Sequence, residues 1–230
     1  MTSGETERID WERIRHLLKV GCFAALMVLA ADMLLGWGTF YRDVPGLPPM
    51  WARFLLVSDG RIIASALLGL IGIPLECLCW FAVYRMIKPF SEKNAHDYRA
   101  GLIGCLAFGG CGVHVPCCMA AFLLKRFYQL NPDTVVENMK PFLIWFLLPA
   151  TMIFLIFFIL TAVVQIRAFI KGNTPLPKWC WVFNIMIGIP WIVLMRVVGD
   201  YPITNALAAA WISVGNLWMM GGLLIMTRGK

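Results

Sequence analysis

Residues 99–124 read RAGLIGCLAFGGCGVHVPCCMAAFLL, and after Arg99 this stretch contains only apolar or small side chains apart from His114. A helix needs about 20 such residues to cross the hydrocarbon core of a bilayer. A backbone at that depth must satisfy its own hydrogen bonds, and the stretch lacks the alternating pattern of a barrel strand. The stretch therefore predicts a membrane-spanning helix.

The middle of this stretch is unusual for a lipid-facing helix. Residues 109–118, GGCGVHVPCC, combine glycines and thiols with His114 and Pro116. Pro116 removes a backbone donor and frees the carbonyl of Gly112, while the glycines loosen the same turn. We therefore expect His114 on a kinked or unwound helix, as is common where transporters bind substrate. The alternative is that the glycines only allow close packing.

The composition indicates that the whole chain is membrane-embedded. Of its 230 residues, 60% are hydrophobic and 14% are charged. A soluble domain averages about a quarter charged residues, so the composition indicates a membrane protein. The apolar runs predict an all-α, polytopic bundle of about six transmembrane helices, in one membrane domain over residues 1–230 and without a soluble domain. The expected spans are residues 17–37, 61–86, 99–124, 141–166, 178–198 and 203–227.

The basic residues give an expected orientation. The formal net charge is +7, but Lys and Arg are scattered between the spans. This argues against nucleic acid as a partner and indicates contacts with membrane lipids. The connections on the side of the two termini, including Arg8, carry more Lys and Arg than the connections on the other side, including Arg42. Because cytoplasmic loops are enriched in these residues, we expect both termini in the cytoplasm.

Ionisable residues inside the spans are the candidate functional residues. An ionised side chain facing lipid at the bilayer centre costs at least about 2.5–3.5 kcal/mol, so these groups should point toward each other or toward water. With the expected topology most of them lie at one depth, where they would line a polar cavity open to the outer side. The walls are Asp32, His114, Arg196, Asp200 and Asn205, and the floor holds Glu76 and Asn216.

We predict catalytic roles for three of these residues, Asp32, Glu76 and His114. Glu76 has no cation assigned nearby, so we expect its carboxyl group to be protonated. The alternative is that the polar residues only hold the helices together, for example through an Arg196–Asp200 salt bridge one turn apart. The predicted ligand-binding residues are Arg196, Asp200, Asn205, Asn216, Trp191 and Trp211.

We expect neither a metal nor another cofactor. One helical face would carry three possible metal ligands at positions i, i+3 and i+7, namely Cys111, His114 and Cys118. Their sulfur and imidazole groups could bind one metal ion. No second span offers a further ligand at that depth, although this alternative stays open. Haem held between two spans would need a histidine from each, but His16 and His96 lie near the expected cytoplasmic surface.

Three segments resemble an uncharacterised family of bacterial six-span membrane proteins. They are AADMLLGWG at residues 30–38, KGNTPLPKW at residues 171–179, and the run from Asn205 to Asn216. The resemblance covers most of the chain and implies the bacterial inner membrane, but it supplies no activity. A fainter similarity to sterol-isomerase and sigma-2-receptor type proteins lies only in the mixture of buried carboxylates, His and Trp, so no residue role follows from it.

Three functions fit these observations. The first is binding of a small amphipathic or lipid-like molecule in the cavity, with acid–base chemistry of an isomerase type by His114 with Asp32 or Glu76. The second is a small proton- or ion-coupled transporter, which we would expect to be a homodimer because six spans make a thin pathway. The third is a non-catalytic assembly or sensor subunit whose polar residues only join helices.

Overall fold

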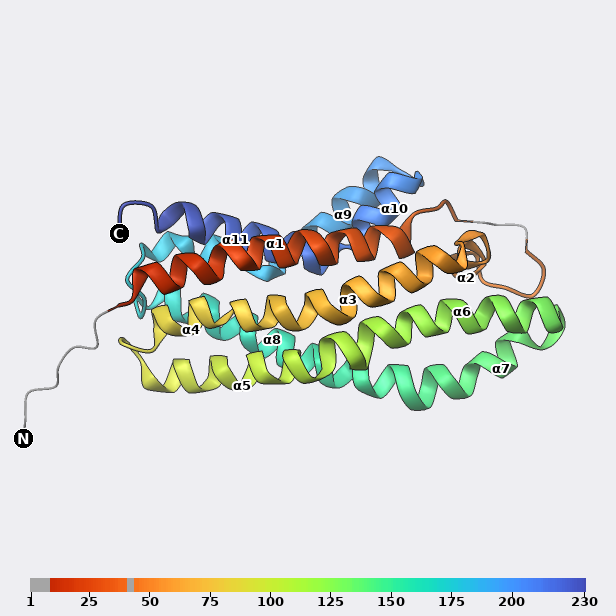
Figure 1. Cartoon of the computed structure of the whole chain (residues 1–230), viewed down its shortest axis with the longest axis horizontal. Coiled ribbons are helices and arrows are strands. Elements are labelled where there is room, and N and C mark those ends of the chain that lie inside the picture. Colours follow the sequence, from red (N-terminus) through yellow and green to blue (C-terminus); the bar gives the residue numbers. More distant parts are fainter. Residues whose placement is uncertain (1–8, 41–43) are drawn as a thin grey trace, which may run out of the picture.

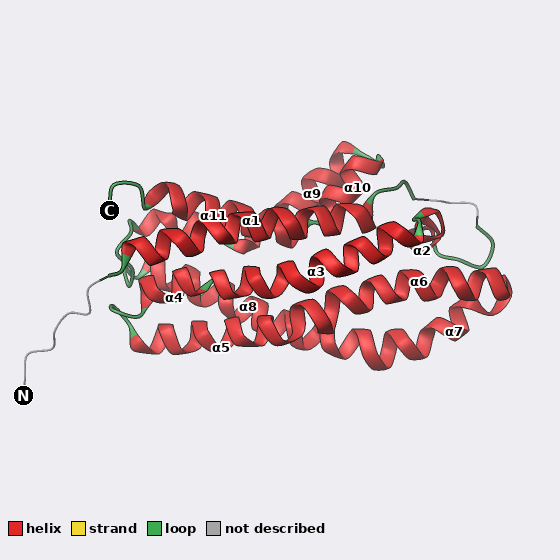
Figure 2. Ribbon diagram, viewed as in Figure 1, coloured by secondary structure: helices red, strands yellow, loops and turns green. Residues whose placement is uncertain are grey.

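The computed structural model describes residues 9–40 and 44–230, and within these ranges every regular element is a helix (Figure 2). This agrees with the all-α bundle that the apolar runs predict. Arg8 and Arg42, two cations of the charge comparison, lie outside the described residues. The start of the first helix and the end of the chain lie at the same end of the bundle (Figure 1), where Nη1 of Arg15 donates to the carbonyl of Lys230 at 2.5 Å.

The first two long helices run side by side. α1 (Trp11–Gly36) begins after Asp10, whose side chain accepts a hydrogen bond from the Arg13 amide. α3 (Asp59–Cys79) packs along α1 and continues as α4 (Phe81–Ile87). Two short helices connect α1 to α3, namely α2 (Pro49–Ala52) and η1 (Arg53–Leu56).

The third long helix is continuous through the stretch that contains His114. α5 (Glu92–Phe108), η2 (Gly109–His114) and α6 (Val115–Leu130) form one rod of 39 residues. At 1.5 Å per residue the rod is about 58 Å long, well beyond the thickness of a bilayer core. The expected kink or unwound turn is instead a π-helix, η2, whose wider turn precedes Pro116 without breaking the rod.

The fourth long helix returns beside the third. Asn131 caps its start by accepting a hydrogen bond from the Asp133 amide at 3.0 Å. The helix then runs to Ile170, and its apolar part is 11% buried, against 33% to 39% for the other long helices. It is therefore the helix with the most outward-facing apolar surface. Its segments are η3 (Pro132–Thr134), α7 (Val135–Phe142), η4 (Leu143–Leu147) and α8 (Leu148–Ile170).

The C-terminal part differs most from the sequence prediction. The expected span at residues 178–198 is not one helix, because Gln165 of α8 donates to the Phe183 carbonyl at 2.7 Å and Asn184 donates to the Ala162 carbonyl at 3.2 Å. These side chains satisfy an irregular backbone. The observed elements are η5 (Lys178–Val182), η6 (Ile185–Ile187), α9 (Gly188–Val198), α10 (Pro202–Ala209) and α11 (Trp211–Met226).

The last expected span is also interrupted, since α10 and α11 meet at an angle of 66° at Ala210. The described residues thus contain four helices that are long and apolar enough to cross a membrane, or up to five if α10 and α11 form one broken span. The expected number of six spans is therefore not confirmed for the described residues. The difference arises in residues 178–226, where polar side chains replace a regular hydrogen-bond ladder.

α1 lies at the centre of the arrangement that positions the site. It packs against α3 on one side and against α10 and α11 on the other, while η2 packs against α3 (Figure 1). Small residues permit these close approaches. A Cβ atom on Gly72 of α3 would meet Val28 of α1, and a Cβ atom on Gly36 of α1 would meet Ala209 of α10.

Candidate functional site

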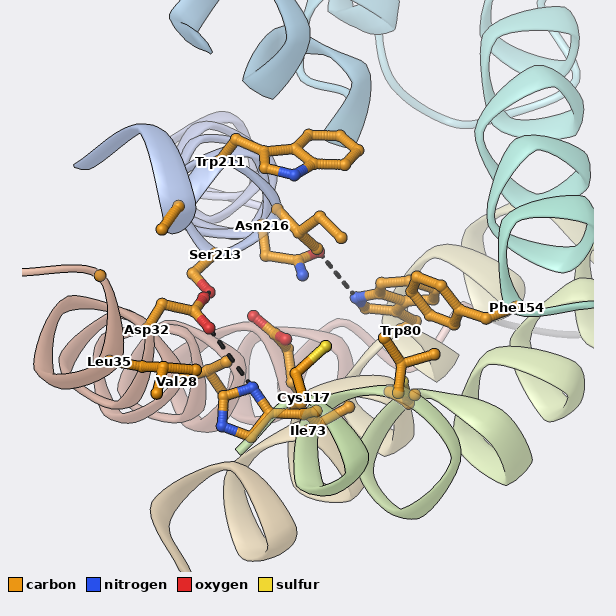
Figure 3. A pocket seen from close by; sticks show the side chains of 18 of the residues that line it. Val28, Asp32, Leu35, Ile73, Trp80, Cys117, Phe154, Trp211, Ser213 and Asn216 are labelled. Carbon is orange, nitrogen blue, oxygen red and sulfur yellow. Dashed lines mark hydrogen bonds and ion pairs between the residues drawn. The ribbon is translucent and has the colours of Figure 1, made fainter. Parts of the chain in front are cut away.

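A cavity of about 310 Å³ lies where α1, α3, η2 and α11 meet (Figure 3). Ligand sites in proteins are concave, have mostly apolar walls and hold a few converging polar groups. This cavity has that character, because most of its walls come from aliphatic and aromatic side chains. The polar residues that line it are Asp32, Arg53, Glu76, His114, Ser213 and Asn216.

Asp32 joins three elements at the cavity wall. Its Oδ1 atom lies 3.4 Å from Nδ1 of His114 on η2, and its Oδ2 atom accepts a hydrogen bond from the Ser213 hydroxyl of α11 at 2.7 Å. Both carboxylate oxygens therefore have partners from other elements. Figure 3 shows the Asp32 side chain beside that of Ser213.

The contacts of His114 fix where its ring carries hydrogen. Nε2 lies 3.0 Å from the backbone carbonyl of Ser65, and a carbonyl can only accept, so Nε2 must be the donor. The other ring nitrogen, Nδ1, faces Asp32. A lone pair pointing at an ionised carboxylate would be repelled, so the Asp32–His114 pair holds one proton, either on the imidazole or on the acid. A pair that holds a single movable proton can serve in acid–base chemistry.

Gly69 makes room for this histidine. A Cβ atom built on Gly69 would overlap the imidazole ring of His114, so the ring lies directly on the backbone of α3. Ser65 is one turn away on the same face of α3 and supplies the carbonyl that holds Nε2. The small-residue face of α3, together with the π-helix, therefore determines the position of the His114 ring.

The inner part of the cavity holds two unpartnered polar atoms. Trp80 donates from Nε1 to Oδ1 of Asn216 at 3.1 Å, which fixes the orientation of the amide (Figure 3). Among the described residues, no hydrogen bond is formed by two buried atoms, Oε1 of Glu76 and Nδ2 of Asn216. The Asn216 side chain lies beside the Glu76 carboxyl group and interacts with it, and Asp32 is a nearby charged residue. A buried acid and a buried amide donor thus remain available beside the same cavity.

The two tryptophans predicted to bind ligand differ in position. Trp211 lines the cavity and packs edge-on against Phe158 with 5.6 Å between ring centroids. Trp191 does not line the cavity, because its Nε1 donates to the carbonyl of Leu207 at 3.1 Å and thereby ties α9 to α10. This placement corrects the expectation for Trp191.

Three further predicted residues form a separate cluster beyond the end of α1. Asn205 accepts a hydrogen bond from Nη1 of Arg196 at 2.8 Å and donates to Oδ1 of Asp200 at 2.6 Å. It also donates to the carbonyl of Gly38 at 2.7 Å. Asp200 in turn accepts from the Phe40 amide at 3.2 Å.

This arrangement corrects two expectations. Arg196, Asp200 and Asn205 do not line the cavity, because α10 bends away from α11 and directs Asn205 toward the end of α1. The expected Arg196–Asp200 salt bridge is not formed either, since Asn205 lies between the two charged groups.

Arg53 is a cavity residue that the sequence pattern does not predict. Its guanidinium lies over the rings of Phe54, at 4.8 Å, and Phe40, at 5.7 Å. Its Nε and Nη1 atoms are buried, and neither has a hydrogen-bond partner in residues 9–40 and 44–230. Burial lowers the pKa of the Arg53 guanidinium, as does the nearby charge of Arg196, whereas Asp200 raises it. The sequence feature that could have indicated Arg53 is its place as the one charged residue among the aromatic and aliphatic residues of the segment 51–56.

The stripe of Cys111, His114 and Cys118 does not form a cluster. Cys111 is exposed, whereas the Cys118 thiol is buried 3.5 Å from the Ser65 hydroxyl. The wider turn of the π-helix shifts the spacing, so residues at steps of three and seven no longer share one face. Across residues 9–40 and 44–230, no group of three His, Cys, Asp or Glu side chains is placed to hold a metal ion.

Ser65, His114 and Asp32 lie in the order of a hydrolase triad, but the chemistry does not fit. The Ser65 hydroxyl is 3.4 Å from Nε2 of His114, yet that nitrogen is taken by the Ser65 carbonyl. Ser65 is completely buried and does not line the cavity. A nucleophile must reach its substrate, so this serine serves to position His114.

Comparison with known proteins gives one match. The chain is similar over residues 1–230 to a family model described as "Family of unknown function (DUF6796)". No curated protein and no solved structure matches the chain. An assignment of function must therefore come from the cavity itself.

Proposed function

For this chain, which belongs to the family of unknown function DUF6796, we propose that the cavity binds a small amphipathic or lipid-like molecule. The chain has helices apolar enough to place the cavity within a membrane. Molecules that reach such a site from lipid combine an apolar body with a polar group. The cavity matches this combination, with apolar walls around a small set of polar atoms.

The observation that carries the proposal is the pair of unpartnered atoms, Oε1 of Glu76 and Nδ2 of Asn216. A buried polar atom without a hydrogen bond costs about 1–3 kcal/mol. Both residues line the cavity and are nearly inaccessible, at 2% and 1% exposed. A ligand hydroxyl group would satisfy both atoms at once, because it can accept a hydrogen bond from Nδ2 of Asn216 and donate one to Oε1 of Glu76.

The chemistry that suits this site is proton transfer. The Asp32–His114 pair holds one proton at the wall, and Glu76 offers a second carboxyl group deeper in the cavity. Two proton-exchanging groups that border one cavity support an isomerase-type enzyme, in which one group gives a proton and the other removes one. In this proposal Asp32, His114 and Glu76 are the catalytic residues, and Asn216 and Trp211 contact the ligand.

The proposed location is the inner membrane of a bacterial cell, with both termini in the cytoplasm. The start of α1 and the end of the chain lie together, which supports one shared side for the termini. The cavity rim at Arg53 then lies toward the outer side. Charge reversal tests this orientation, because adding Lys and Arg to the connection 44–58 should invert the chain if the loops determine topology.

The binding proposal is tested by ligand-induced stabilisation of the purified protein. A panel of fatty acids, fatty alcohols, sterols and isoprenoid alcohols is added, and melting is measured for the wild type, Asp32→Asn and His114→Gln. We expect at least one amphipathic compound to stabilise the wild type and both variants to lose most of that shift. Arg126→Gln is the control, because Arg126 lies outside the cavity. If no compound shifts the wild type, the proposal fails.

A second candidate function is proton-coupled transport, favoured by the broken helix beside the cavity. α10 and α11 meet at Ala210 with a bend of 66°, and Ala209, Trp211 and Ser213 on either side line the cavity. Interrupted helices often border the substrate site of transporters. Transport by a proposed homodimer requires flux in proteoliposomes that depends on a pH gradient and that Glu76→Gln abolishes. If the flux does not depend on the pH gradient, proton-coupled transport is excluded.

The non-catalytic alternative makes a different prediction. If the polar residues only join helices in an assembly or sensor subunit, Asp32→Asn and His114→Gln should greatly reduce stability while no added compound binds. Measuring both melting temperature and ligand shift on the same samples separates this alternative from ligand binding.

A further inference from the structure

Arg53 has a binding capacity that the fold does not use. Its Nε and Nη1 atoms are buried without hydrogen-bond partners among the described residues, and the guanidinium lies over the faces of Phe54 and Phe40. An arginine carries five N–H donors and stays charged, so buried donors without an acceptor are costly. Because Arg53 also lines the cavity, an acceptor bound in the cavity can reach it.

Among the residues that the structure describes, no directly paired carboxylate neutralises the charge of Arg53. A second guanidinium, that of Arg196, lies over the same Phe40 ring at 4.9 Å. The nearby carboxylate, Asp200, accepts hydrogen bonds from the Phe40 amide and from Asn205. Among the described residues, no carboxylate forms an ion pair with Arg53 or Arg196. Within the described residues, Arg53 is therefore a cation at the cavity wall that has no ion-pair partner.

A second, apolar pocket of about 170 Å³ adjoins the cavity close to Arg53. The two spaces share Leu35, Phe54 and Cys117 as walls. The walls that belong only to the second pocket are apolar, namely Trp51, Ala120, Ala121, Leu124, Met139, Leu143 and Leu147. A hydrocarbon chain extending from a group bound at Arg53 thus has an apolar pocket next to it.

We infer that the ligand is an amphipathic anion, whose acidic group, a carboxylate or phosphate, binds Arg53 at the rim while its hydrocarbon chain occupies the adjoining apolar pocket. This inference rests on the proposed function and specifies the ligand class of the same cavity. Guanidinium groups bind both oxyanions through charge-assisted hydrogen bonds. The anion supplies the acceptors that Nε and Nη1 lack, and it balances the charge of Arg53.

The inference is tested by measuring dissociation constants in nanodiscs for ligands with one chain length and different head groups. The compounds are a long-chain fatty acid, the corresponding alcohol, the monoacylglycerol and the lysophosphatidic acid. Charge-assisted hydrogen bonds should make at least one of the two anions bind roughly 10- to 100-fold more tightly than the neutral compounds. The anion with the larger preference identifies the head group as carboxylate or phosphate.

Variants of Arg53 assign this preference to the residue. Arg53→Gln should reduce the affinity for the anion to that for the alcohol, and Arg53→Lys should keep part of the preference, because one charge remains without the planar donors. Arg126→Gln removes an exposed cation outside both pockets and should change nothing. If Arg53→Gln does not fold, the affinities of the wild type for the acid and the alcohol still show whether the cavity prefers an anion.

Two results overturn the inference. If the wild type binds the alcohol as tightly as both anions, or if Arg53→Gln keeps the full preference, Arg53 is not the anion site. The cavity proposal survives that outcome provided that the neutral compounds bind. If neither the neutral nor the anionic compounds bind to the wild type, the proposed function fails together with the inference.

Discussion

Nδ1 of His114 lies 3.4 Å from Oδ1 of Asp32, on the side of the imidazole opposite the Ser65 carbonyl that fixes Nε2. The two residues come from α1 and from a π-helical turn in the third long helix. Their contact therefore links two parts of the bundle and holds one proton at the cavity wall. The contact is stronger if the proton is on the imidazole, which makes a charged pair, than if it is on the acid, which makes a neutral pair.

The Asp32–His114 contact should show energetic coupling in a double-mutant cycle of Asp32→Asn and His114→Gln. Interhelical hydrogen bonds between neutral groups in membranes average about 0.6 kcal/mol, whereas contacting residues in charged networks reach about 0.5–3 kcal/mol. We expect a coupling free energy above about 1 kcal/mol, measured by reversible unfolding in mixed micelles. A value near zero would show that the two groups do not interact.

Gly69→Ala should displace His114, because the added methyl group overlaps the imidazole ring. Overpacking of this kind costs about 1–3 kcal/mol, and the loss of the Asp32 contact adds to it. Gly221→Ala is the matched control, since a Cβ atom at Gly221 of α11 meets nothing within 4 Å. There, alanine should be neutral or stabilise by up to about 1 kcal/mol. Equal melting temperatures for the two variants would contradict the described packing.

Glu76 should carry a proton at neutral pH. It is buried, and among the described residues the charged group that acts on it is Asp32 rather than a cation. An ionised carboxylate without a cation would cost at least about 2.5–3.5 kcal/mol near the bilayer centre. Infrared difference spectra of the wild type and Glu76→Gln should therefore contain a protonated carboxyl band that only the wild type shows. A carboxylate band in its place would mean that a cation or water compensates the charge.

The cysteines provide a probe of the cavity that needs no assay of function. Cys111 is exposed, Cys117 lines both pockets, and Cys118 is buried. A small membrane-permeant thiol reagent should modify Cys111 fastest, Cys117 more slowly and Cys118 least. A bound amphipathic compound should slow only Cys117. Mass spectrometry of Cys117→Ala and Cys118→Ala separates the adjacent sites, and equal protection of Cys111 would argue against a cavity effect.

The sequence was sufficient for the helical class and for part of the site. Apolar run length predicts the long helices, and the cost of buried charge predicts that Asp32, Glu76 and His114 turn inward. These three residues do line one cavity. Asn216 and Trp211 of α11 line the same cavity.

The sequence was not sufficient where the backbone departs from a regular helix. The bend at Ala210 depends on contacts of α9, α10 and the end of α1, which are distant along the chain, so it could not be read from local composition. For the same reason Arg196, Asp200 and Asn205 were placed in the cavity although they lie beside it. Arg53 was overlooked because an arginine in an interfacial segment is usually solvated, and only the fold brings it over Phe40.

The central claim is that the cavity holds an amphipathic molecule, and native mass spectrometry of two phenylalanine variants tests it most directly. Cys117→Phe fills the wall shared by the two pockets, whereas Cys111→Phe adds the same side chain at an exposed position outside both pockets. The wild type and Cys111→Phe should carry a bound amphipathic molecule that folded Cys117→Phe lacks. Equal occupancy in all three proteins, or none in the wild type, would contradict the claim.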